Sequence, residues 1–360
     1  MLETGLVTAT YNGDGCFTPS TSSADVAVNP AASAVSVSAV SNTSVCGETV
    51  TVCATVTAVA PGNGTPTGTI TFTGAGLDET VDVAVDGTAC ATTSSLTTGT
   101  VTATYSGDGC LLPSTGSADV TVVPAASTVS VTVDPSPSVC GQPVTVCATV
   151  TPVAPGSGTP TGSVTFLLSD GTTQAVGLDA NGSACVTSSS LITGAVTAVY
   201  NGDGCFLAST GSADVTVEPA ASSVSVTVDP SPSVCGQPVT VCATVTPVAP
   251  GSGTPTGTLT FTGPGGFNEI VPVAPDGTAC VTTSSLTGGT YRAVYNGDRC
   301  VAGSDAVFDV TVDQAASSTT VTVDPSPSVC GQSVTVCATV TAVAPGNGTP
   351  TGTVIFTGPG

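Results

Sequence analysis

Hydrophobic and polar residues alternate strictly over short stretches of this chain. In VTVCATV, residues 144–150, the letters place Val, Val, Ala and Val on one side and Thr, Cys and Thr on the other. This period of two is typical of a β-strand with one buried face. No stretch has apolar residues at helical spacing over three turns, so the chain is predicted to be all-β. Further strands are expected at VSVTV (129–133), SVTFLL (163–168), SACVTSSSL (183–191), AVTAVY (195–200) and SADVTVE (212–218).

Clusters of Gly and Pro separate these strands. APGSGTPTG at 154–162 and NGDG at 201–204 are examples, and such clusters mark turns and loops. Seven or so short strands with turns every 8–12 residues predict a β-sandwich of immunoglobulin type. We label its strands A to G in order. Each core is small, so covalent cross-links are expected.

The pattern repeats along the chain. SVCGQPVTVCATVTPVAPGSGTPTG at 138–162 recurs at 233–257, with close variants beginning at Ser44 and Ser328. Its first cysteine recurs at spacings of 94, 95 and 95 residues, at Cys46, Cys140, Cys235 and Cys330. A unit of this length is the size of one small β domain. The fold class predicted is therefore a tandem array of immunoglobulin-like sandwiches, arranged as a rod.

The repeat sets the expected domain boundaries. We predict three complete repeats, called repeats 1, 2 and 3 below, at residues 33–123, 128–218 and 223–313. Residues 1–30 match only strands F and G of a repeat, and residues 319–360 match only strands A to C. Two interpretations of these partial repeats stay open. Either the sequence is a segment of a longer protein, which we favour, or neighbouring molecules complete the two halves.

The charge is strongly one-sided. The chain has 24 acidic residues, two arginines, no Lys and no His, and a net charge of −22. Such a charge disfavours nucleic acid and anionic membrane surfaces as partners. The first residues contain no signal peptide, and no apolar run is long enough to insert into a membrane.

A family resemblance follows from these motifs. The order GQPVTVCATVTPVAPGSGTPTGTLTF (236–261), DGTACVTTSSL (276–286) and YNGD (295–298) resembles the bacterial immunoglobulin-like repeats of large surface proteins and adhesins, and the likeness covers essentially all of the chain. The resemblance implies an extracellular, non-catalytic, multi-domain rod. The chain departs from the family in its 15 cysteines, because such repeats commonly carry none. Cysteines in this number, without His, favour disulfides and an oxidising compartment.

One pair of cysteines in each repeat is predicted to cross-link strands B and E. Cys53 on strand B and Cys90 on strand E both alternate out of phase with the core residues, so both face solvent. B and E are antiparallel neighbours in an immunoglobulin-type sandwich, where opposed residues lie within disulfide distance. We therefore expect the bonds Cys53–Cys90, Cys147–Cys185 and Cys242–Cys280. Free surface thiols are the alternative.

The other two cysteines of a repeat cannot pair with each other. Cys46 lies at the A–B end and Cys110 at the F–G end, about 20–30 Å apart along strand B, and a disulfide spans at most about 7 Å between Cα atoms. In a head-to-tail string, however, the A–B end of one repeat meets the F–G end of the next. We therefore expect inter-domain bonds Cys46–Cys205 and Cys140–Cys300.

Five cysteines remain without a partner in this scheme. Their partners are expected outside the given sequence: Cys16, Cys110, Cys235, Cys330 and Cys337. Lateral disulfides between molecules are the competing interpretation. The partners predicted are thus like repeats of the same or neighbouring chains, associating head-to-tail or laterally.

The residues that common catalytic sites require are missing. Without His or Lys, no Ser-His-Asp triad and no Schiff base can form. Asp14, Asp108, Asp203 and Asp298 lie near the F–G turns and are candidate calcium ligands, but no loop has the alternating-oxygen spacing of a dedicated calcium site, and turn formation explains them better. We therefore expect no enzyme, no cofactor and no metal. The predicted function is an extracellular structural protein forming a stiff surface stalk, fibre or filament. The alternative is the stalk of a bacterial surface adhesin that presents a separate binding head.

Overall fold

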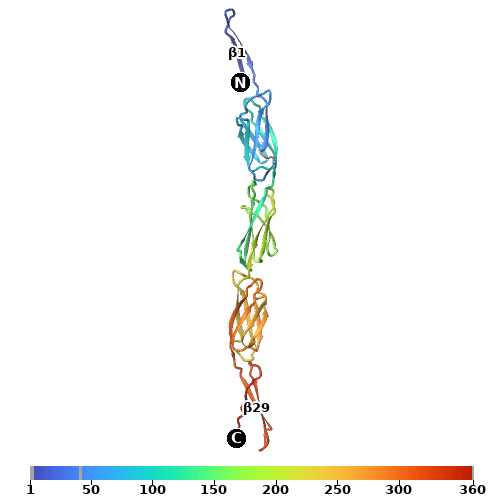
Figure 1. Cartoon of the computed structure of the whole chain (residues 1–360), viewed down its shortest axis with the longest axis vertical. Coiled ribbons are helices and arrows are strands. Elements are labelled where there is room, and N and C mark those ends of the chain that lie inside the picture. Colours follow the sequence, from blue (N-terminus) through green and yellow to red (C-terminus); the bar gives the residue numbers. More distant parts are fainter. Residues whose placement is uncertain (1–3, 40–42, 359–360) are drawn as a thin grey trace.

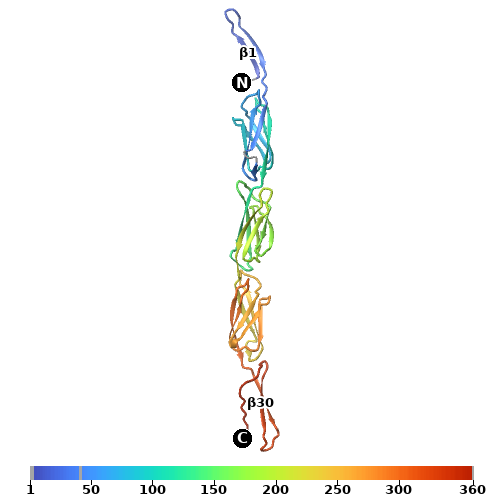
Figure 2. The same ribbon diagram turned by 45° about the vertical axis from the view of Figure 1, so that its right-hand side comes forward.

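The computed structural model describes residues 4–39 and 43–358. Apart from the short 3₁₀ turn η1 (Pro264–Gly266), every regular element in these residues is a β-strand. Three complete sandwiches follow one another along the long axis of the molecule, and a two-stranded piece lies at each end (Figures 1 and 2). The predicted fold class, tandem immunoglobulin-like sandwiches in an all-β chain, is confirmed.

Repeat 2 shows the topology of a complete sandwich. The first sheet has the order A-B-E and consists of β11 (Ser127–Asp134), β13 (Val144–Pro152) and β16 (Ser183–Ser188). In the second sheet β17 (Gly194–Tyr200) is strand F and lies between strand C, β14 (Ser163–Leu167), and strand G, β18 (Ser209–Val215). The short strand β15 (Thr173–Gly177) pairs with the free edge of β14. All these pairs are antiparallel.

A short continuation of strand A crosses to the second sheet, which the sequence pattern did not predict. We call it strand A′. In repeat 2 it is β12 (Ser138–Val139), which pairs in parallel with β19 (Val217–Glu218), the last part of strand G. Strand A thus begins on one sheet and ends beside strand G on the other. Both strands therefore run toward the same end of the repeat.

Repeats 1 and 3 have the same plan. In repeat 1 the strands are β3 (Ser33–Ala39), β4 (Thr43–Val45), β5 (Val50–Ala58), β6 (Thr69–Gly74), β7 (Leu77–Asp82), β8 (Thr88–Thr93), β9 (Gly99–Tyr105) and β10 (Ser114–Val123). In repeat 3 they are β20 (Ser222–Asp229), β21 (Ser233–Val234), β22 (Val239–Pro247), β23 (Thr258–Thr262), β24 (Asn268–Pro272), β25 (Thr278–Thr283), β26 (Gly289–Tyr295), β27 (Ser304–Val310) and β28 (Val312–Asp313).

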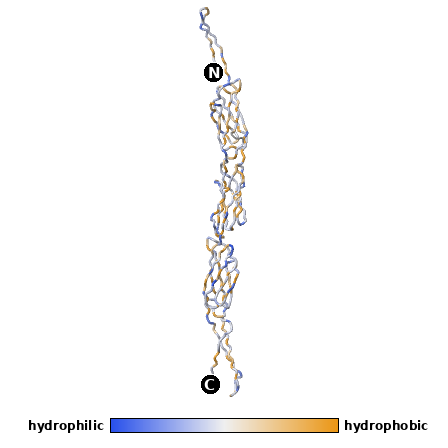
Figure 3. Tube along the Cα trace, viewed as in Figure 1, coloured by the Kyte–Doolittle hydropathy of each residue, from blue (hydrophilic) through white to orange (hydrophobic). Residues whose placement is uncertain are grey.

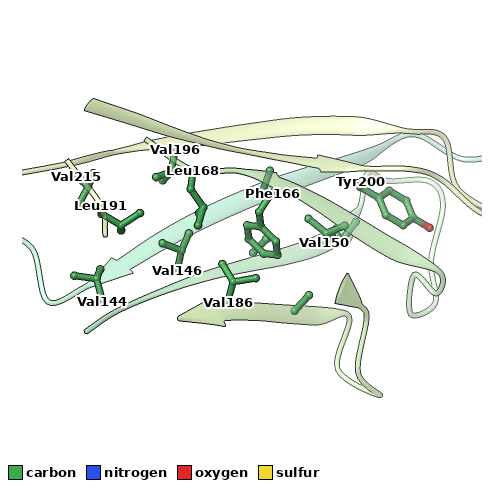
Figure 4. Close-up of a cluster of buried hydrophobic side chains, with 14 of the residues drawn as sticks. Val144, Val146, Val150, Phe166, Leu168, Val186, Leu191, Val196, Tyr200 and Val215 are labelled. Carbon is green, nitrogen blue, oxygen red and sulfur yellow. The ribbon is translucent and has the colours of Figure 1, made fainter. Parts of the chain in front are cut away.

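The alternation in the sequence accounts for each core. Along β13, Val144, Val146, Ala148 and Val150 are buried, and the residues between them are partly exposed. They meet Phe166 and Tyr200 of the second sheet in the space between the two layers (Figure 4). Along the described residues, hydrophobic and hydrophilic positions alternate over short distances (Figure 3), and each repeat has a separate cluster of buried residues. Each repeat therefore has its own small core, as the strand pattern requires.

The two end pieces contain fewer strands. β1 (Gly5–Tyr11) and β2 (Ser20–Val26) form an antiparallel hairpin that corresponds to strands F and G. β29 (Ser317–Asp324) and β30 (Thr335–Ala342) correspond to strands A and B. The expectation of a third strand, C, in residues 319–360 is wrong, because no strand occurs among residues 343–358. In repeat 2 strand C is held by β15 and β17, and this piece has no counterpart of either. The exact domain boundaries stay a prediction.

Candidate functional site at the joints between repeats

The cysteines of strands B and E are bonded within each repeat. Cys147 of β13 lies directly opposite Cys185 of β16, with their Cα atoms 4.1 Å apart. The disulfides Cys53–Cys90 and Cys242–Cys280 have the same Cα separation of 4.1 Å. These are the pairs that the alternation predicted. They lie on the outer face of the A-B-E sheet, so they cross-link two strands without occupying the core.

The remaining bonded cysteines lie where one repeat meets the next. Cys46 of repeat 1 is bonded to Cys205 of repeat 2, with a Cα separation of 5.4 Å. Cys140 of repeat 2 is bonded to Cys300 of repeat 3, with a Cα separation of 5.3 Å. Each bond joins the turn before strand B, the A′–B turn, to the F–G turn of the following repeat. The structure thus brings together the inter-domain pairs expected from the sequence.

The F–G turn is shaped by an aspartate carboxylate. One carboxylate oxygen of Asp203 accepts hydrogen bonds from the backbone N–H groups of Cys205 (2.7 Å) and Phe206 (2.6 Å). Its other oxygen accepts hydrogen bonds from the N–H (2.9 Å) and hydroxyl (2.7 Å) of Thr161 in the B–C loop. Partial burial raises the pKa of this carboxyl, but the four hydrogen bonds outweigh it and lower the pKa to about 2. Asp203 therefore fixes the backbone at Cys205.

The same arrangement recurs in the other complete repeats. Asp298 accepts hydrogen bonds from Thr256, Cys300 and Val301, and its pKa is likewise lowered to about 2 against the effect of burial. Asp108 accepts the corresponding bonds in repeat 1. The sequence carries a signal for this contact, since a TPTG loop precedes the NGDG-like turn of each complete repeat by about 40 residues. The oxygens of these carboxylates accept hydrogen bonds that hold the turn. Residues 4–39 and 43–358 contain no cluster of three or more potential metal-ligating side chains.

The A′–B turn is held by strand G of its own repeat. The N–H of Cys140 donates to the carbonyl of Glu218 (2.8 Å), next to the parallel pair β12–β19. The N–H of Val139 donates to the side-chain oxygen of Gln142 (3.0 Å), which closes the turn. Gly141 has φ +78°, and a Cβ there would overlap the carbonyl oxygen of Ser252 in the next repeat. Glycine is required both for this backbone conformation and for this close approach.

We call the joint between repeats 1 and 2 the first joint, that between repeats 2 and 3 the second, and that between repeat 3 and the C-terminal piece the third. Two further contacts complete the second joint. Ser252 of the B–C loop of repeat 3 donates its N–H to the carbonyl of Cys140 (3.1 Å) and its hydroxyl to the carbonyl of Gly141 (2.8 Å). In the linker, Ala220 donates its N–H to the carbonyl of Cys300 (2.8 Å) and accepts a hydrogen bond from the N–H of Ala302 (2.8 Å). Ala220 is fully buried. The joint therefore consists of a docked linker, a loop contact and a disulfide.

The first joint repeats these contacts. Ala125 of its linker is fully buried, donates its N–H to the carbonyl of Cys205 (2.8 Å) and accepts from the N–H of Leu207 (2.8 Å). Ser157 donates its hydroxyl to the carbonyl of Gly47. The five remaining cysteines are exposed and carry free thiols in this structure: Cys16, Cys110, Cys235, Cys330 and Cys337. Partners for them outside the given sequence stay a prediction.

A family match decides the identity of the repeats. Residues 37–123, 131–218 and 226–313 each match the bacterial Ig-like domain (group 3). The chain belongs to this family. Its repeats are therefore bacterial Ig-like domains, a type common in non-enzymatic surface proteins. Their disulfides favour a location outside the cytoplasm. The described residues include no helix that is both long and apolar enough to cross a membrane.

Solved structures show a distant similarity. The adhesin FdeC of Escherichia coli is 18% identical with a TM-score of 0.26, and the match covers 80% of this chain and 98% of that one. Three N-terminal domains of the bacteriophage RB49 outer capsid protein Hoc are 14% identical with a TM-score of 0.30, covering 79% and 100%. The mouse nectin-like molecule 4 ectodomain is 12% identical with a TM-score of 0.29, covering 76% and 96%. Similarity at this level says nothing about function. None of the curated proteins matches the chain.

Proposed function

We propose that this chain is part of an extracellular structural protein, in which disulfide-stapled Ig-like domains form a stiff surface stalk, fibre or filament. The observation that carries the proposal is the pair of inter-domain disulfides, Cys46–Cys205 and Cys140–Cys300. A binding or catalytic domain has no evident need for covalent bonds across its joints. A long particle that must stay straight needs such bonds, because a free linker would allow each joint to bend.

The physical argument rests on the number of attachments at a joint. A linker of four or five residues restricts two domains but does not by itself fix the angle between them. At the second joint, however, repeats 2 and 3 are also connected by the Cys140–Cys300 bond and by the contacts of Ser252 with the A′–B turn. Three attachments oppose bending and twisting more than the linker alone would. The same logic applies to the first joint.

The surface charge fits an exposed polymer. A net charge of −22 on 360 residues makes neighbouring molecules repel one another. Trypsin-like proteases find only Arg292 and Arg299 to cleave after, because the chain has no Lys. Association with like repeats, head-to-tail or laterally, is part of the proposal.

Electron microscopy of single molecules tests the stiffness. We expect a narrow distribution of bend angles at the first two joints of the oxidised chain. The variant C46S/C205S/C140S/C300S is expected to give a broad distribution at both joints. The variant C147S/C185S is the matched control, because it removes a disulfide within repeat 2 and leaves the joints intact. A broad bend-angle distribution already in the oxidised chain would contradict the stiff-stalk function and favour a flexible adhesin stalk. Equally narrow distributions in the oxidised chain and the joint variant would contradict the role of the joint disulfides.

Two further measurements test the premises. Peptide mapping without reduction should find Cys140 linked to Cys300 and Cys46 linked to Cys205. Antibodies against the repeats should label intact cells of the source organism. Free joint cysteines, or labelling only after the cells are opened, would overturn the extracellular stalk.

A further inference from the structure

Repeat 2 is attached covalently to each neighbour at two points. At the end that faces repeat 1, the polypeptide enters at Ala125, and the disulfide to Cys46 is at Cys205. These points adjoin, because the N–H of Ala125 donates to the carbonyl of Cys205 (2.8 Å). At the other end the disulfide to repeat 3 is at Cys140, and the polypeptide leaves toward Ala220. Cys140 also lies beside the exit, since its N–H donates to Glu218.

Two short segments connect these ends. The first, Ala125–Cys140, contains strands A and A′ and spans 15 residue steps. The second, Cys205–Ala220, contains strand G and also spans 15 residue steps. We call them the A route and the G route. Both run the length of the repeat, and their ends pair in parallel as β12 and β19. The 65 steps between Cys140 and Cys205, which hold strands B to F, belong to neither route.

We propose that the joints make this chain a load-bearing tether, in which tension passes along the A and G routes and bypasses strands B to F. This goes beyond stiffness, since a stiff joint need not carry tension past a domain. If strands B to F unfold under tension, the routes still connect the neighbouring repeats. The molecule therefore keeps its length when a repeat loses its core.

The stretched length of an unfolded repeat differs measurably with and without the joint disulfides. A route of 15 steps reaches at most about 50 Å when fully stretched, and its strands are already extended in the fold. A repeat of 95 residues without disulfides would reach about 320 Å. With only the B–E disulfide kept, its loop of 38 residues in repeat 2 is closed off, and the reach falls to about 190 Å. The joints therefore limit the stretched length about fourfold.

Repeats 1 and 3 each retain one route. In repeat 1 the A route runs from Ala31 to Cys46, and Cys110 at the start of its G route is free. In repeat 3 the G route runs from Cys300 to Ala315, and Cys235 at the end of its A route is free. Each disulfide therefore completes one route in each of the two repeats it joins. Only repeat 2 has both.

This connectivity predicts how many long unfolding steps each variant shows when the 360-residue chain is pulled through tags at its two ends. In every form the end pieces, residues 1–30 and 316–360, also open, because no joint disulfide bypasses them, and they reach at most about 100 and 150 Å. Beyond these two openings, the oxidised chain should show no lengthening step above about 50 Å. C46S/C205S removes the only route of repeat 1 but leaves the A route of repeat 2, so one further step of about 150 Å is expected. C140S/C300S likewise frees repeat 3 alone. The variant lacking both joint disulfides should show three such steps.

Several outcomes would overturn the inference. One is a step of about 150 Å or more in the oxidised chain beyond the opening of its two end pieces. Another is two long steps in C46S/C205S, which would mean that the A route of repeat 2 carries no load. The control C147S/C185S should still show no long step beyond those of the end pieces, although its repeat 2 is less stable. The test is separable from the imaging of bend angles. Straight particles with long steps would refute only the tether, and bent particles with short steps would refute only the stiff stalk.

Discussion

The second joint, between repeats 2 and 3, and the third joint, between repeat 3 and the C-terminal piece, have the same loop contact but differ in the disulfide. At both joints the A′–B turn meets the B–C loop of the following piece. Ser252 donates its N–H to Cys140 (3.1 Å), and Asn347 donates its N–H to Cys235 (3.3 Å). At the second joint an F–G turn supplies Cys300. At the third joint residues 317–358 hold no F–G turn, and a hollow lined by Cys235, Ala315 and Asn347 lies beside the linker.

This difference teaches that the joint is assembled from two independent parts. The loop contact needs only strands A and B of the following repeat, which the end piece has in β29 and β30. The covalent bond needs the F–G turn, and that turn is supplied by the second sheet. A complete sandwich is therefore a condition for a locked joint. Four predictions sharpen this comparison.

The largest effect on stability is expected at a phenylalanine that occupies the same position in repeat 2 and in the C-terminal piece. Phe166 of strand C is fully buried in repeat 2, and the corresponding Phe356 is 53% exposed. Phe166→Ala should destabilise repeat 2 by about 3–5 kcal/mol, because it removes a buried ring and leaves a cavity. Phe356→Ala should change stability very little. Hydrogen exchange of peptides from each region measures both, and equal protection losses would contradict the difference in packing.

The next effect concerns the B–E disulfide. Cys147–Cys185 closes a loop in repeat 2, whereas Cys337 at the same position of the last piece is free. The variant C147S/C185S should lose about 2–4 kcal/mol of repeat 2 stability, because its unfolded chain is less constrained. Cys337→Ser should leave unfolding unchanged. Chemical denaturation followed by hydrogen exchange separates the two, and a loss of similar size in Cys337→Ser would show that its thiol has an undetected partner.

A matched pair of glycines tests the loop contact. Gly141 and Gly331 both have φ +78°, but a Cβ at Gly141 would overlap Ser252, while the space around Gly331 is open. Each substitution by Ala costs about 1–2 kcal/mol for the left-handed backbone. Only Gly141→Ala should also push repeat 3 away and lower the fraction of Cys140–Cys300 formed in a glutathione buffer. Mass spectrometry of trapped thiols measures that fraction, and equal fractions in both variants would contradict the role of the contact.

The smallest effect is on the pH dependence of repeat 2 stability. Asp203 has a folded-state pKa of about 2, below its ordinary value of 3.8. A lowered pKa stabilises the fold above the unfolded value, and this stabilisation is lost as the pH falls from about 4 through 2. We expect a loss of about 1–2 kcal/mol for repeat 2, which Asp203→Asn should abolish.

Asp14 in the N-terminal hairpin is the natural control. Its carboxylate accepts the same two turn bonds, from the N–H groups of Cys16 (2.8 Å) and Phe17 (2.9 Å), and these lower its pKa. It has no threonine partner from a B–C loop, since the hairpin consists of strands F and G alone. NMR titration should therefore find that Asp14 titrates above Asp203. The reverse order would show that the Thr161 contact is unimportant.

Much of the fold followed from the sequence because its signals are local. Alternation along residues 144–150 identified the buried face, and the phase of Cys147 and Cys185 placed both on the outer face of neighbouring strands. The repeat of about 95 residues identified the domains. The joint pairs also followed, but only by assuming that repeats lie head-to-tail.

What the tertiary structure decided depends on partners that no local pattern reveals. The letters TVIF at 353–356 have the alternation of strand C, yet no strand forms, because this piece has no counterparts of β15 and β17 to pair with it. The parallel pairing of β12 with β19 joins residues about 80 positions apart. The A and G routes follow from that pairing and from the joint disulfides together. Side-chain alternation is a property of one strand, whereas register, pairing and the path of a load depend on which segments meet in space.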